Sequence, residues 1–158
     1  MPSPSPPAVA AYTPRAPYSV GPKEPLGNAR RLMEKYFIRD LPVRAEGKLV
    51  GLLSERDLRL VWKLTHPPPE TLDVEQAMTA EPYTVTSSDS VDEVVRVMLE
   101  RGIDAAVVLD DAGHITGVFT ATNAMEALVD LLEPKRTRPG ERSKPAQTRR
   151  AMRGRDPR

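Results

Sequence analysis

The chain has 158 residues, of which 17 are proline and none is cysteine, and its formal net charge at pH 7 is +1. Without cysteine it can have no disulfide framework, no thiol nucleophile and no thiolate metal site. No stretch approaches the roughly 18 consecutive apolar residues of a membrane helix, and the start lacks the basic and apolar regions of a secretory signal. We therefore expect a soluble, cytoplasmic protein that has no contact with membranes.

The chain begins with residues 1–16, a proline- and alanine-rich segment that we predict to be disordered. Directly after it, Pro17 to Val20 begins a pattern that recurs 65 residues later, at Pro82 to Val85. Likewise, Gly51 to Asp57 recurs 66 residues later, at Gly117 to Asn123. Halves of this length bury little apolar surface alone, so the two are expected to share one core. The duplication predicts one pseudosymmetric α/β domain with a cleft where the halves meet.

The first repeat, residues 17–65, is predicted to run strand, helix, strand, strand, helix. Apolar residues recur at the three- and four-residue spacing of an amphipathic helix on either side of a short hairpin. The residues expected on the apolar faces of these two helices are Leu26, Ala29, Leu32, Met33, Leu58, Val61 and Trp62. Trp62 could belong to the core or to an interface between subunits. Residues 66–80 then form a proline-rich linker with a short helix.

The second repeat, residues 81–133, has the same predicted order of elements. Ser90 followed by Glu93 is a capping box that predicts the start of a helix. The uninterrupted apolar run from Ala105 to Leu109 predicts a strand that is covered on both faces. The closing helix is expected to bury one apolar face. The residues of that face are Ala124, Met125, Leu128, Leu131 and Leu132.

Residues 134–158 are predicted to form a basic, disordered tail, because they contain ten Lys or Arg and only two acidic residues. Such a tail could bind a polyanion by displacing the counterions of the polyanion. One interpretation of the chain is therefore a nucleic-acid or polyanion interaction protein, in which residues 135–158 bind and the repeats are a scaffold. The interpretation that we favour places the function in the repeats.

Two pairs of polar residues occur where a strand gives way to a helix: Ser54 with Asp57, and Thr120 with Asn123. The helix N-terminus can receive an anion there, the carboxylate can accept hydrogen bonds from a ribose, and the hydroxyl can donate to a phosphate. Taken singly, each pair is better explained as an ordinary capping box. Its recurrence beside the same strand favours a binding site. Because no catalytic triad, metal-ligand cluster or phosphate-binding loop is present, neither catalysis nor metal binding is predicted.

The residues from Met33 to Asp57, which include Ile38-Arg39-Asp40-Leu41-Pro42-Val43 and Gly47-Lys48-Leu49-Val50-Gly51, resemble a cystathionine-β-synthase (CBS) domain. The second repeat resembles another, introduced by Val74-Glu75-Gln76-Ala77-Met78-Thr79, and the resemblance covers residues 17–133. It implies a tandem CBS pair, or Bateman module, in which each repeat is roughly β-α-β-β-α. It also implies a regulatory, non-catalytic protein that forms a homodimer, requires no cofactor and signals to an unidentified protein target by conformational change.

The resemblance further implies that an adenine nucleotide binds in the clefts between the repeats, with AMP, ADP, ATP and S-adenosylmethionine as candidates. Carried over to this sequence, the first site consists of Ser54, Asp57, Leu52, Ile38, Arg39, Leu41, Pro42, Arg56, Ser19 and Val20. The second site consists of Thr120, Asn123, Val118, Ile103, Ala105, Thr84 and Val85.

Three residues depart from the family pattern. Asn123 is neutral where the family usually has Asp, so it should hold a ribose less strongly. Asp40 and Asp104 stand near positions where the family often places a basic residue against phosphates, which leaves Arg39 and Arg56 as the main counter-charges in the first site. We therefore expect AMP, or another adenosine compound of low charge, in preference to ATP.

Overall fold

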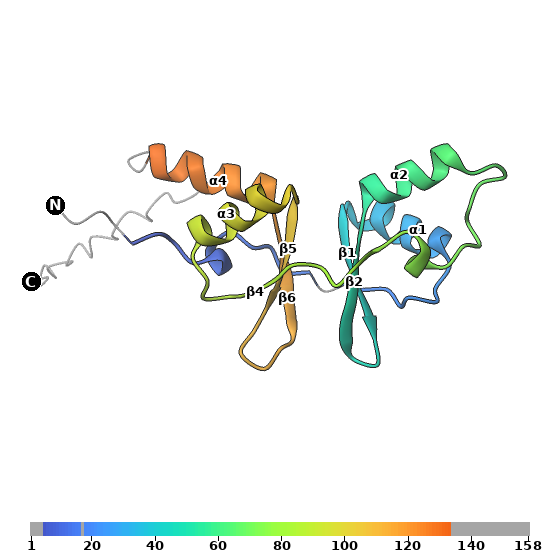
Figure 1. Cartoon of the computed structure of the whole chain (residues 1–158), viewed down its shortest axis with the longest axis horizontal. Helices are drawn as coiled ribbons and strands as arrows, with labels where there is room; N and C mark the ends of the chain where they lie inside the picture. The colour runs from blue at the N-terminus through green and yellow to red at the C-terminus, as the bar shows by residue number, and fades with distance from the viewer. Residues whose placement is uncertain (1–4, 17, 134–158) are drawn as a thin grey trace, which may run out of the picture.

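The computed structural model describes residues 5–16 and 18–133. The predicted tail, and with it the polyanion-binding interpretation, lies outside the described residues. The chain forms two repeats of the predicted α/β type (Figure 1). Repeat 1 contains α1 (Leu26–Tyr36), β1 (Asp40–Ala45), β2 (Lys48–Ser54) and α2 (Glu55–Leu64). Repeat 2 contains β4 (Thr84–Thr86), α3 (Val91–Arg101), β5 (Ala105–Leu109), β6 (Ile115–Thr120) and α4 (Ala121–Leu132). Three short elements lie outside these sets: the 3-10 helices η1 (Val9–Ala11) and η2 (Val74–Gln76), and β3 (Thr79–Ala80).

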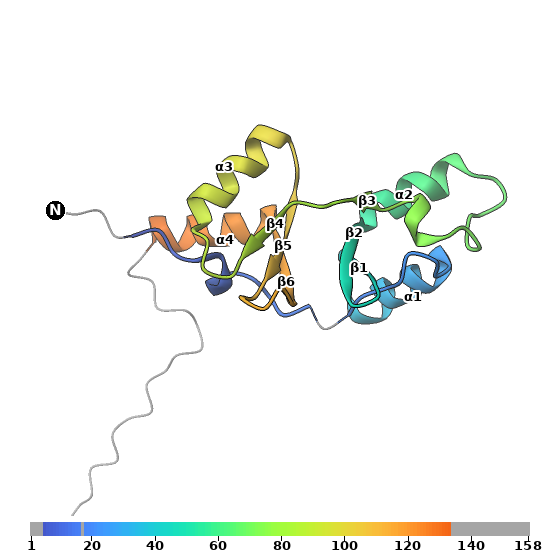
Figure 2. The ribbon, with the colours of Figure 1, turned by 60° about the horizontal axis from the view of Figure 1, so that its bottom comes forward.

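The two sheets face each other at the centre of the molecule, and the helices lie on the outer sides (Figures 1 and 2). The strand order is β1-β2-β3 in one sheet and β4-β5-β6 in the other. The hairpins β1–β2 and β5–β6 are antiparallel, whereas β4 runs parallel to β5. Leu52, Val107 and Val118 are buried together where the sheets meet. The repeats therefore share an apolar contact, as the duplication predicts.

The short segment that precedes each repeat packs against the other repeat. Val9 of η1 is fully buried in the core of repeat 2, and Val74 of η2 is fully buried in the core of repeat 1. The Val9 N–H donates to the Asp89 carbonyl at 2.8 Å, and the Val74 N–H donates to the Glu24 carbonyl at 2.9 Å. Val9 and Val74 are 65 positions apart, as are Glu24 and Asp89. The exchange of segments therefore follows the same symmetry as the duplication.

Residues 5–16 belong to the folded domain, so the predicted disorder of residues 1–16 does not hold for them. The segment is rich in proline, but it contains one apolar residue, Val9, that packs in the core between β4, β5 and the outer helices of repeat 2. The sequence does contain a signal for this arrangement, since Val9 stands in register with Val74. The duplicated unit therefore begins before Pro17.

The recurring glycines Gly51 and Gly117 lie where the exchanged segments cross the hairpins. A Cβ atom on Gly117 would collide with the carbonyl oxygen of Pro14, and one on Gly51 would collide with the side chain of Met78. Arg15 forms a β-bridge with Gly117, and Gly51 pairs with β3 in the same way. At Gly117 another backbone approaches too closely for any side chain, whereas at Gly51 the closest neighbour is the flexible side chain of Met78.

The closing helix α4 does not bury the face that was predicted. Ala127 and Asn123 are its buried residues, and Ala124 is half-buried against the same core. The larger side chains of the predicted face are exposed, namely Met125, Leu128, Leu131 and Leu132. Apolar residues occupy more of the helix circumference than the sheet and α3 can cover, and the small residue Ala127 lies on the covered side. An apolar strip therefore faces outward.

The remaining expectations for the elements are met with small differences. Leu26, Ala29, Met33 and Leu58 are buried as predicted, and Leu32, Val61 and Trp62 are half-buried around the same core. Ser90 is the N-cap residue of α3 but makes no side-chain capping hydrogen bond. The predicted first strand is reduced to a bridge between Val20 and Val43. In the described part of the chain, no helix has the length and apolar content needed to span a membrane.

Candidate functional site

A cavity of about 570 Å³ lies between the two repeats and is lined by both. The first turn of α2, with its N-cap, contributes Ser54, Arg56 and Asp57, and the corresponding part of α4 contributes Thr120 and Ala121. The less polar part of the wall consists of Leu52, Pro82, Tyr83, Ile103 and Ala105. The cavity therefore joins parts of both predicted sites at one opening, with a helix N-terminus from each repeat.

Both helix starts are held by capping boxes. In repeat 1 the Asp57 N–H donates to Ser54 Oγ at 3.0 Å, and the Ser54 N–H donates to Asp57 Oδ2 at 3.1 Å. In repeat 2 the Thr120 N–H donates to Asn123 Oδ1 at 2.9 Å, and the Asn123 N–H donates to Thr120 Oγ1 at 3.4 Å. The capping interpretation of these pairs is therefore confirmed. It does not exclude binding, because the same polar groups line or border the cavity.

A backbone bond ties each helix start to the beginning of the neighbouring hairpin. The Glu55 N–H donates to the Arg39 carbonyl at 2.7 Å, and the Ala121 N–H donates to the Asp104 carbonyl at 2.9 Å. These bonds place the side chains that precede β1 and β5 next to the helix N-termini. Charged residues of the hairpins and of the caps consequently share the mouth of the cavity.

Acidic residues from both repeats gather in this cavity. Burial of the Asp40 carboxyl, together with the nearby charges of Asp57 and Asp104, raises the pKa of Asp40 from 3.8 to about 6. Arg39 and Arg56 act in the opposite direction but do not cancel this rise. A carboxylate whose ionised form is destabilised inside a cavity is a feature of binding and catalytic sites.

One ion pair crosses from repeat 1 to repeat 2 at this cavity. Arg56 Nη1 of α2 lies 2.8 Å from Oδ2 of Asp104, which precedes β5. Both side chains are exposed, so water and salt screen the attraction and its contribution to stability is small, on the order of 0–1 kcal/mol. Glu55 is shared in a similar way by Arg59 at 2.7 Å and Arg39 at 4.0 Å. The arginines around the cavity are therefore already paired with carboxylates.

Predicted site residues from both repeats line the cavity, and they are Arg39, Leu52, Ser54, Arg56, Asp57, Ile103, Ala105 and Thr120. The other predicted residues do not line it. Leu41, Val20 and Val85 are buried in the cores of their own repeats. Pro42 is also buried, Val118 is buried between the sheets and Asn123 is buried beside its cap. Ser19 and Thr84 are exposed elsewhere, and Ile38 lines a separate cavity between α1 and α2. Assignment of any of these residues to a ligand stays a prediction.

Tyr83, Glu55 and Arg59 also line the cavity, although the sequence motifs did not predict them there. The Tyr83 ring lies beneath the Arg101 guanidinium, 4.9 Å from it, at the wall of the cavity. Its counterpart Tyr18 instead stacks on Tyr36 with the ring centres 4.2 Å apart. The recurrence of Pro-Tyr in both repeats was a signal for Tyr83, but only the structure distinguishes the two tyrosines.

Comparisons with known proteins agree with this architecture. The family described as "CBS domain" matches residues 9–63 and 73–130. Inosine-5'-monophosphate dehydrogenase of Thermoplasma acidophilum is 31% identical over 104 residues, which is 66% of this chain and 20% of that enzyme. The chain thus spans about a fifth of the length of the curated relatives it matches.

Solved structures share the fold. The crystal structure of CBSX2 in complex with AMP has a TM-score of 0.67 and 22% identity, and the likeness covers 82% of this chain and 99% of that one. The CBS domain of the bacterial CNNM/CorC family Mg²⁺ transporter in complex with ATP has a TM-score of 0.67 and 18% identity, covering 77% and 87%.

The first family match begins at residue 9 rather than at 17, in agreement with the place of η1 in the fold. The second includes η2 and ends within α4. Together the matches account for both repeats and both exchanged segments. The chain belongs to the CBS domain family and contains two CBS domains in tandem.

Proposed function

We propose that this protein is a regulatory, non-catalytic module that binds an adenine nucleotide in the cavity between its repeats and signals through the relative arrangement of those repeats. The observation that carries the proposal is that one cavity receives a capped helix N-terminus from each repeat. Structures of the same fold were solved with AMP and with ATP. No cofactor is required, and the described residues contain no cluster of three or more His, Asp or Glu that could hold a metal.

The chemistry of the wall suits a nucleoside monophosphate. Asp57 can accept hydrogen bonds from ribose hydroxyls, and Ser54 can donate to a phosphate held at a helix N-terminus. The Thr120 hydroxyl would have to exchange its bond to Asn123 Oδ1, at 2.9 Å, to donate in the same way. Ile103, beside the Tyr83 ring, offers a less polar surface to the base. The buried, neutral Asn123 should grip a ribose less strongly than Asp57 does. We therefore propose that repeat 1 supplies the main ribose contact.

The charges of the cavity favour few phosphates. Its wall contains four carboxylates, of Asp40, Glu55, Asp57 and Asp104, and only three guanidinium groups, of Arg39, Arg56 and Arg59. Each further phosphate adds negative charge to a site that is already short of cations. We propose AMP as the preferred ligand over ADP and ATP, and S-adenosylmethionine as the candidate without phosphate.

The ion pair between Arg56 and Asp104 gives a route from binding to signalling. A phosphate at the start of α2 would compete with Asp104 for Arg56, and so would weaken the bond that now links the repeats. The ligand can shift the arrangement only by the difference in its affinity for the two states. Binding of an unidentified protein target would then depend on the arrangement of the outer helices.

Calorimetric titration with AMP, ADP, ATP and S-adenosylmethionine tests the proposal. Asp57→Asn keeps a capping side chain, as Asn123 does in repeat 2, but removes the charge. We expect the wild-type protein to bind AMP more tightly than ADP or ATP. Asp57→Asn should lower the affinity for AMP about tenfold, because a hydrogen bond to a carboxylate is stronger than one to an amide. Asp111→Asn, in the exposed β5–β6 turn, is the matched control. Unchanged AMP affinity in Asp57→Asn, or no binding of any of these compounds, would refute the proposal.

A further inference from the structure

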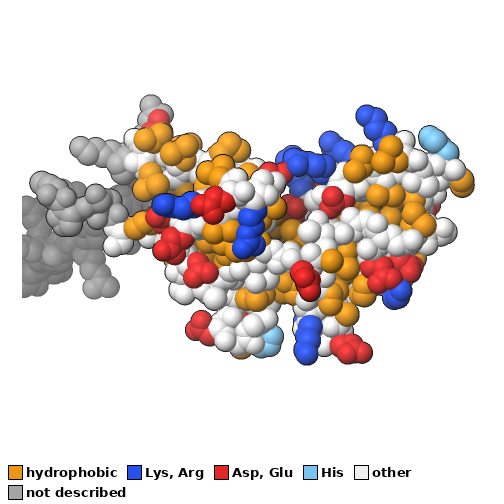
Figure 3. Space-filling model, in the orientation of Figure 1, with side chains coloured by type: hydrophobic (Ala, Val, Ile, Leu, Met, Phe, Trp, Pro, Cys, Tyr) orange, Lys and Arg blue, Asp and Glu red, His pale blue; other side chains and the backbone are white. Residues whose placement is uncertain are grey.

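The Asp40 side chain lies beside the helix start where we propose that the phosphate binds. Asp40 begins β1 and pairs with Ser54 across the hairpin, and Ser54 is the N-cap residue of α2. Both residues line the cavity between the repeats, and Asp40 is half-buried there. Acidic and basic side chains lie close to one another where the repeats meet (Figure 3). A phosphate at the start of α2 would therefore lie close to the Asp40 carboxyl.

Two neighbouring carboxylates, of Asp57 and Asp104, have partners that stabilise their charged forms. Asp57 Oδ2 accepts a hydrogen bond from the Ser54 N–H at 3.1 Å. Asp57 also lies in the first turn of α2, where the helix dipole favours negative charge. Asp104 Oδ2 lies 2.8 Å from Arg56 Nη1. A hydrogen bond or an opposite charge at such a distance favours the ionised form of a carboxyl group.

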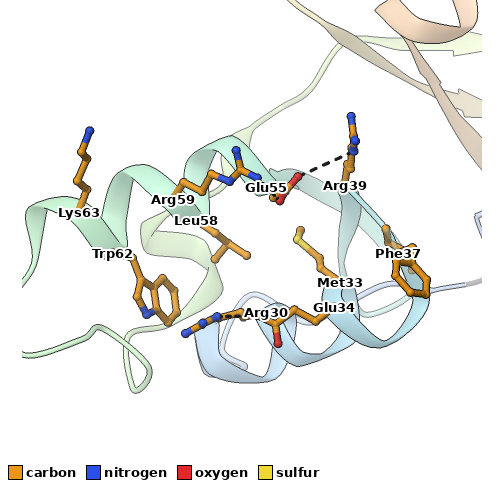
Figure 4. Close-up of a pocket in the computed structure, with 11 residues that line it drawn as sticks. Arg30, Met33, Glu34, Phe37, Arg39, Glu55, Leu58, Arg59, Trp62 and Lys63 are labelled. Carbon is orange, nitrogen blue, oxygen red and sulfur yellow. Dashed lines mark hydrogen bonds and ion pairs between the residues drawn. The ribbon is translucent and has the colours of Figure 1, made fainter.

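The arginine next to Asp40 in the sequence is directed to a different carboxylate. In Figure 4 a dashed line joins Arg39 to Glu55, and Arg39 Nε lies 4.0 Å from Glu55 Oε2. Arg59 holds the other oxygen of Glu55 at 2.7 Å. Among the described residues, none forms a hydrogen bond or an ion pair with the Asp40 carboxyl. Asp40 is therefore the carboxylate of the cavity whose charge is compensated least.

The electrostatic surroundings of Asp40 act in the same direction as this geometry. Burial of the carboxyl, followed by the charges of Asp57 and Asp104, raises the pKa of Asp40 from 3.8 to about 6. Arg39 and Arg56 oppose the rise without cancelling it. The protonated form of Asp40 is therefore within reach near neutral pH, before any ligand binds.

A bound phosphate would add negative charge to a cavity in which carboxylates already outnumber guanidinium groups by four to three. It would also compete with Asp104 for Arg56, and so would leave the Asp104 charge uncompensated. Uptake of one proton relieves this repulsion, and it costs least at Asp40, which has no partner to lose. A protonated carboxyl can donate a hydrogen bond to a phosphate oxygen, whereas an ionised one can only accept. Among the described residues that line the cavity, Tyr83 is the remaining titratable one, and burial raises its pKa above 10.0, so it stays neutral.

We propose that Asp40 takes up a proton when the phosphate of AMP binds at the start of α2, so that this protein responds to pH as well as to the nucleotide. The proton comes from the solvent and forms an O–H bond on the carboxyl group, which then donates to a phosphate oxygen. The complex holds one more proton at Asp40 than the free protein does, so the affinity for AMP falls as the pH rises. This inference rests on the proposed function, because it gives a role to a residue of the same cavity.

Calorimetric titration with AMP at pH 5.5 and pH 7.5 tests the inference, with Asp40→Asn as the variant. Asparagine has nearly the shape of neutral aspartate and needs no proton to donate to a phosphate. With the pKa of free Asp40 at about 6, linkage predicts that Asp40→Asn binds AMP about 30-fold more tightly than the wild type at pH 7.5, and less than about twofold more tightly at pH 5.5. The titration of AMP itself cancels in this ratio. Asp111→Asn, in the exposed β5–β6 turn, should bind AMP with the wild-type affinity at both pH values.

Proton counting gives an independent test. Titrations at pH 7.5 in buffers of different ionisation enthalpy should show that the wild type takes up about one more proton per AMP than Asp40→Asn does. Asp104→Asn removes a charge that opposes the ionisation of Asp40, so it should reduce this uptake, and it serves if Asp40→Asn does not fold. If AMP binds but the ratio of affinities is the same at both pH values, or the uptake is the same in all three proteins, the inference is wrong and the nucleotide site stands. If none of the proteins binds AMP at either pH, the inference falls together with the proposed function.

Discussion

Replacement of Asp40 by Asn should stabilise the protein at neutral pH and less so in acid. The Asp40 carboxyl lies in the cavity between the repeats, where burial and the charges of Asp57 and Asp104 raise its pKa from 3.8 to about 6. Asparagine has nearly the same shape and can never become charged. The variant therefore removes the cost of an ionised group while keeping the packing.

The size of the effect follows from the two pKa values. A tenfold change in proton affinity corresponds to about 1.4 kcal/mol, so ionised Asp40 lowers the free energy of unfolding at pH 7.5 by about 3 kcal/mol. Between pH 4 and pH 6 the folded state binds more protons at Asp40 than the unfolded state does. Its stabilising protonated form is therefore fully present below pH 4 and is lost as the pH rises through 6. At pH 4.5 the expected cost is about 1 kcal/mol.

Urea unfolding followed by circular dichroism, without nucleotide, measures the difference. We expect Asp40→Asn to exceed the wild type in free energy of unfolding by about 3 kcal/mol at pH 7.5 and by about 1 kcal/mol at pH 4.5. Asp111→Asn, in the exposed β5–β6 turn, controls for the loss of one negative charge. If Asp40→Asn is no more stable than the wild type at pH 7.5, or if its advantage does not shrink in acid, the reasoning about the acidic cavity is wrong.

Three further outcomes follow from the exchanged segments and the crossing ion pair. Gly117→Ala should lower the melting temperature more than Gly51→Ala, because its methyl group meets a carbonyl oxygen rather than a flexible side chain; similar melting temperatures would contradict this. Val9→Ala should lower the free energy of unfolding by about 1–3 kcal/mol in urea titrations, as expected for a truncated core residue; no loss would mean that η1 is not part of the core. Arg56→Ala should change stability by less than about 1 kcal/mol yet weaken AMP about tenfold in calorimetry; unchanged AMP binding would remove Arg56 from the site.

The duplicated sequence predicted the order of elements and most of the core. Helical and strand periodicities are local properties, and the same periodicities occur in both repeats. Leu26, Met33 and Leu58 are buried as their spacing predicts. The burial of α4 could not be predicted in the same way. Its apolar residues satisfy helical spacing on more than one face, and only the positions of α3 and the sheet decide which face is covered.

The candidate site was predicted in part. The capping pairs at Ser54 and Thr120 are local motifs, so their positions at the helix starts could be inferred from sequence. Their meeting in one cavity, and the ion pair from Arg56 to Asp104, depend on how the sheets pack through Leu52 and its neighbours. That packing is a long-range property, and no spacing within either repeat encodes it.

Hydrogen–deuterium exchange with and without saturating AMP tests the central claim most directly. If the nucleotide binds between the repeats, protection should increase in peptides that cover residues 54–58 and 120–124, where the two capped helices begin. The protection of peptides that cover α1 should change little. Protection confined to peptides that cover α1, or no change anywhere in the chain, would contradict the proposal that the cavity between the repeats is the nucleotide site.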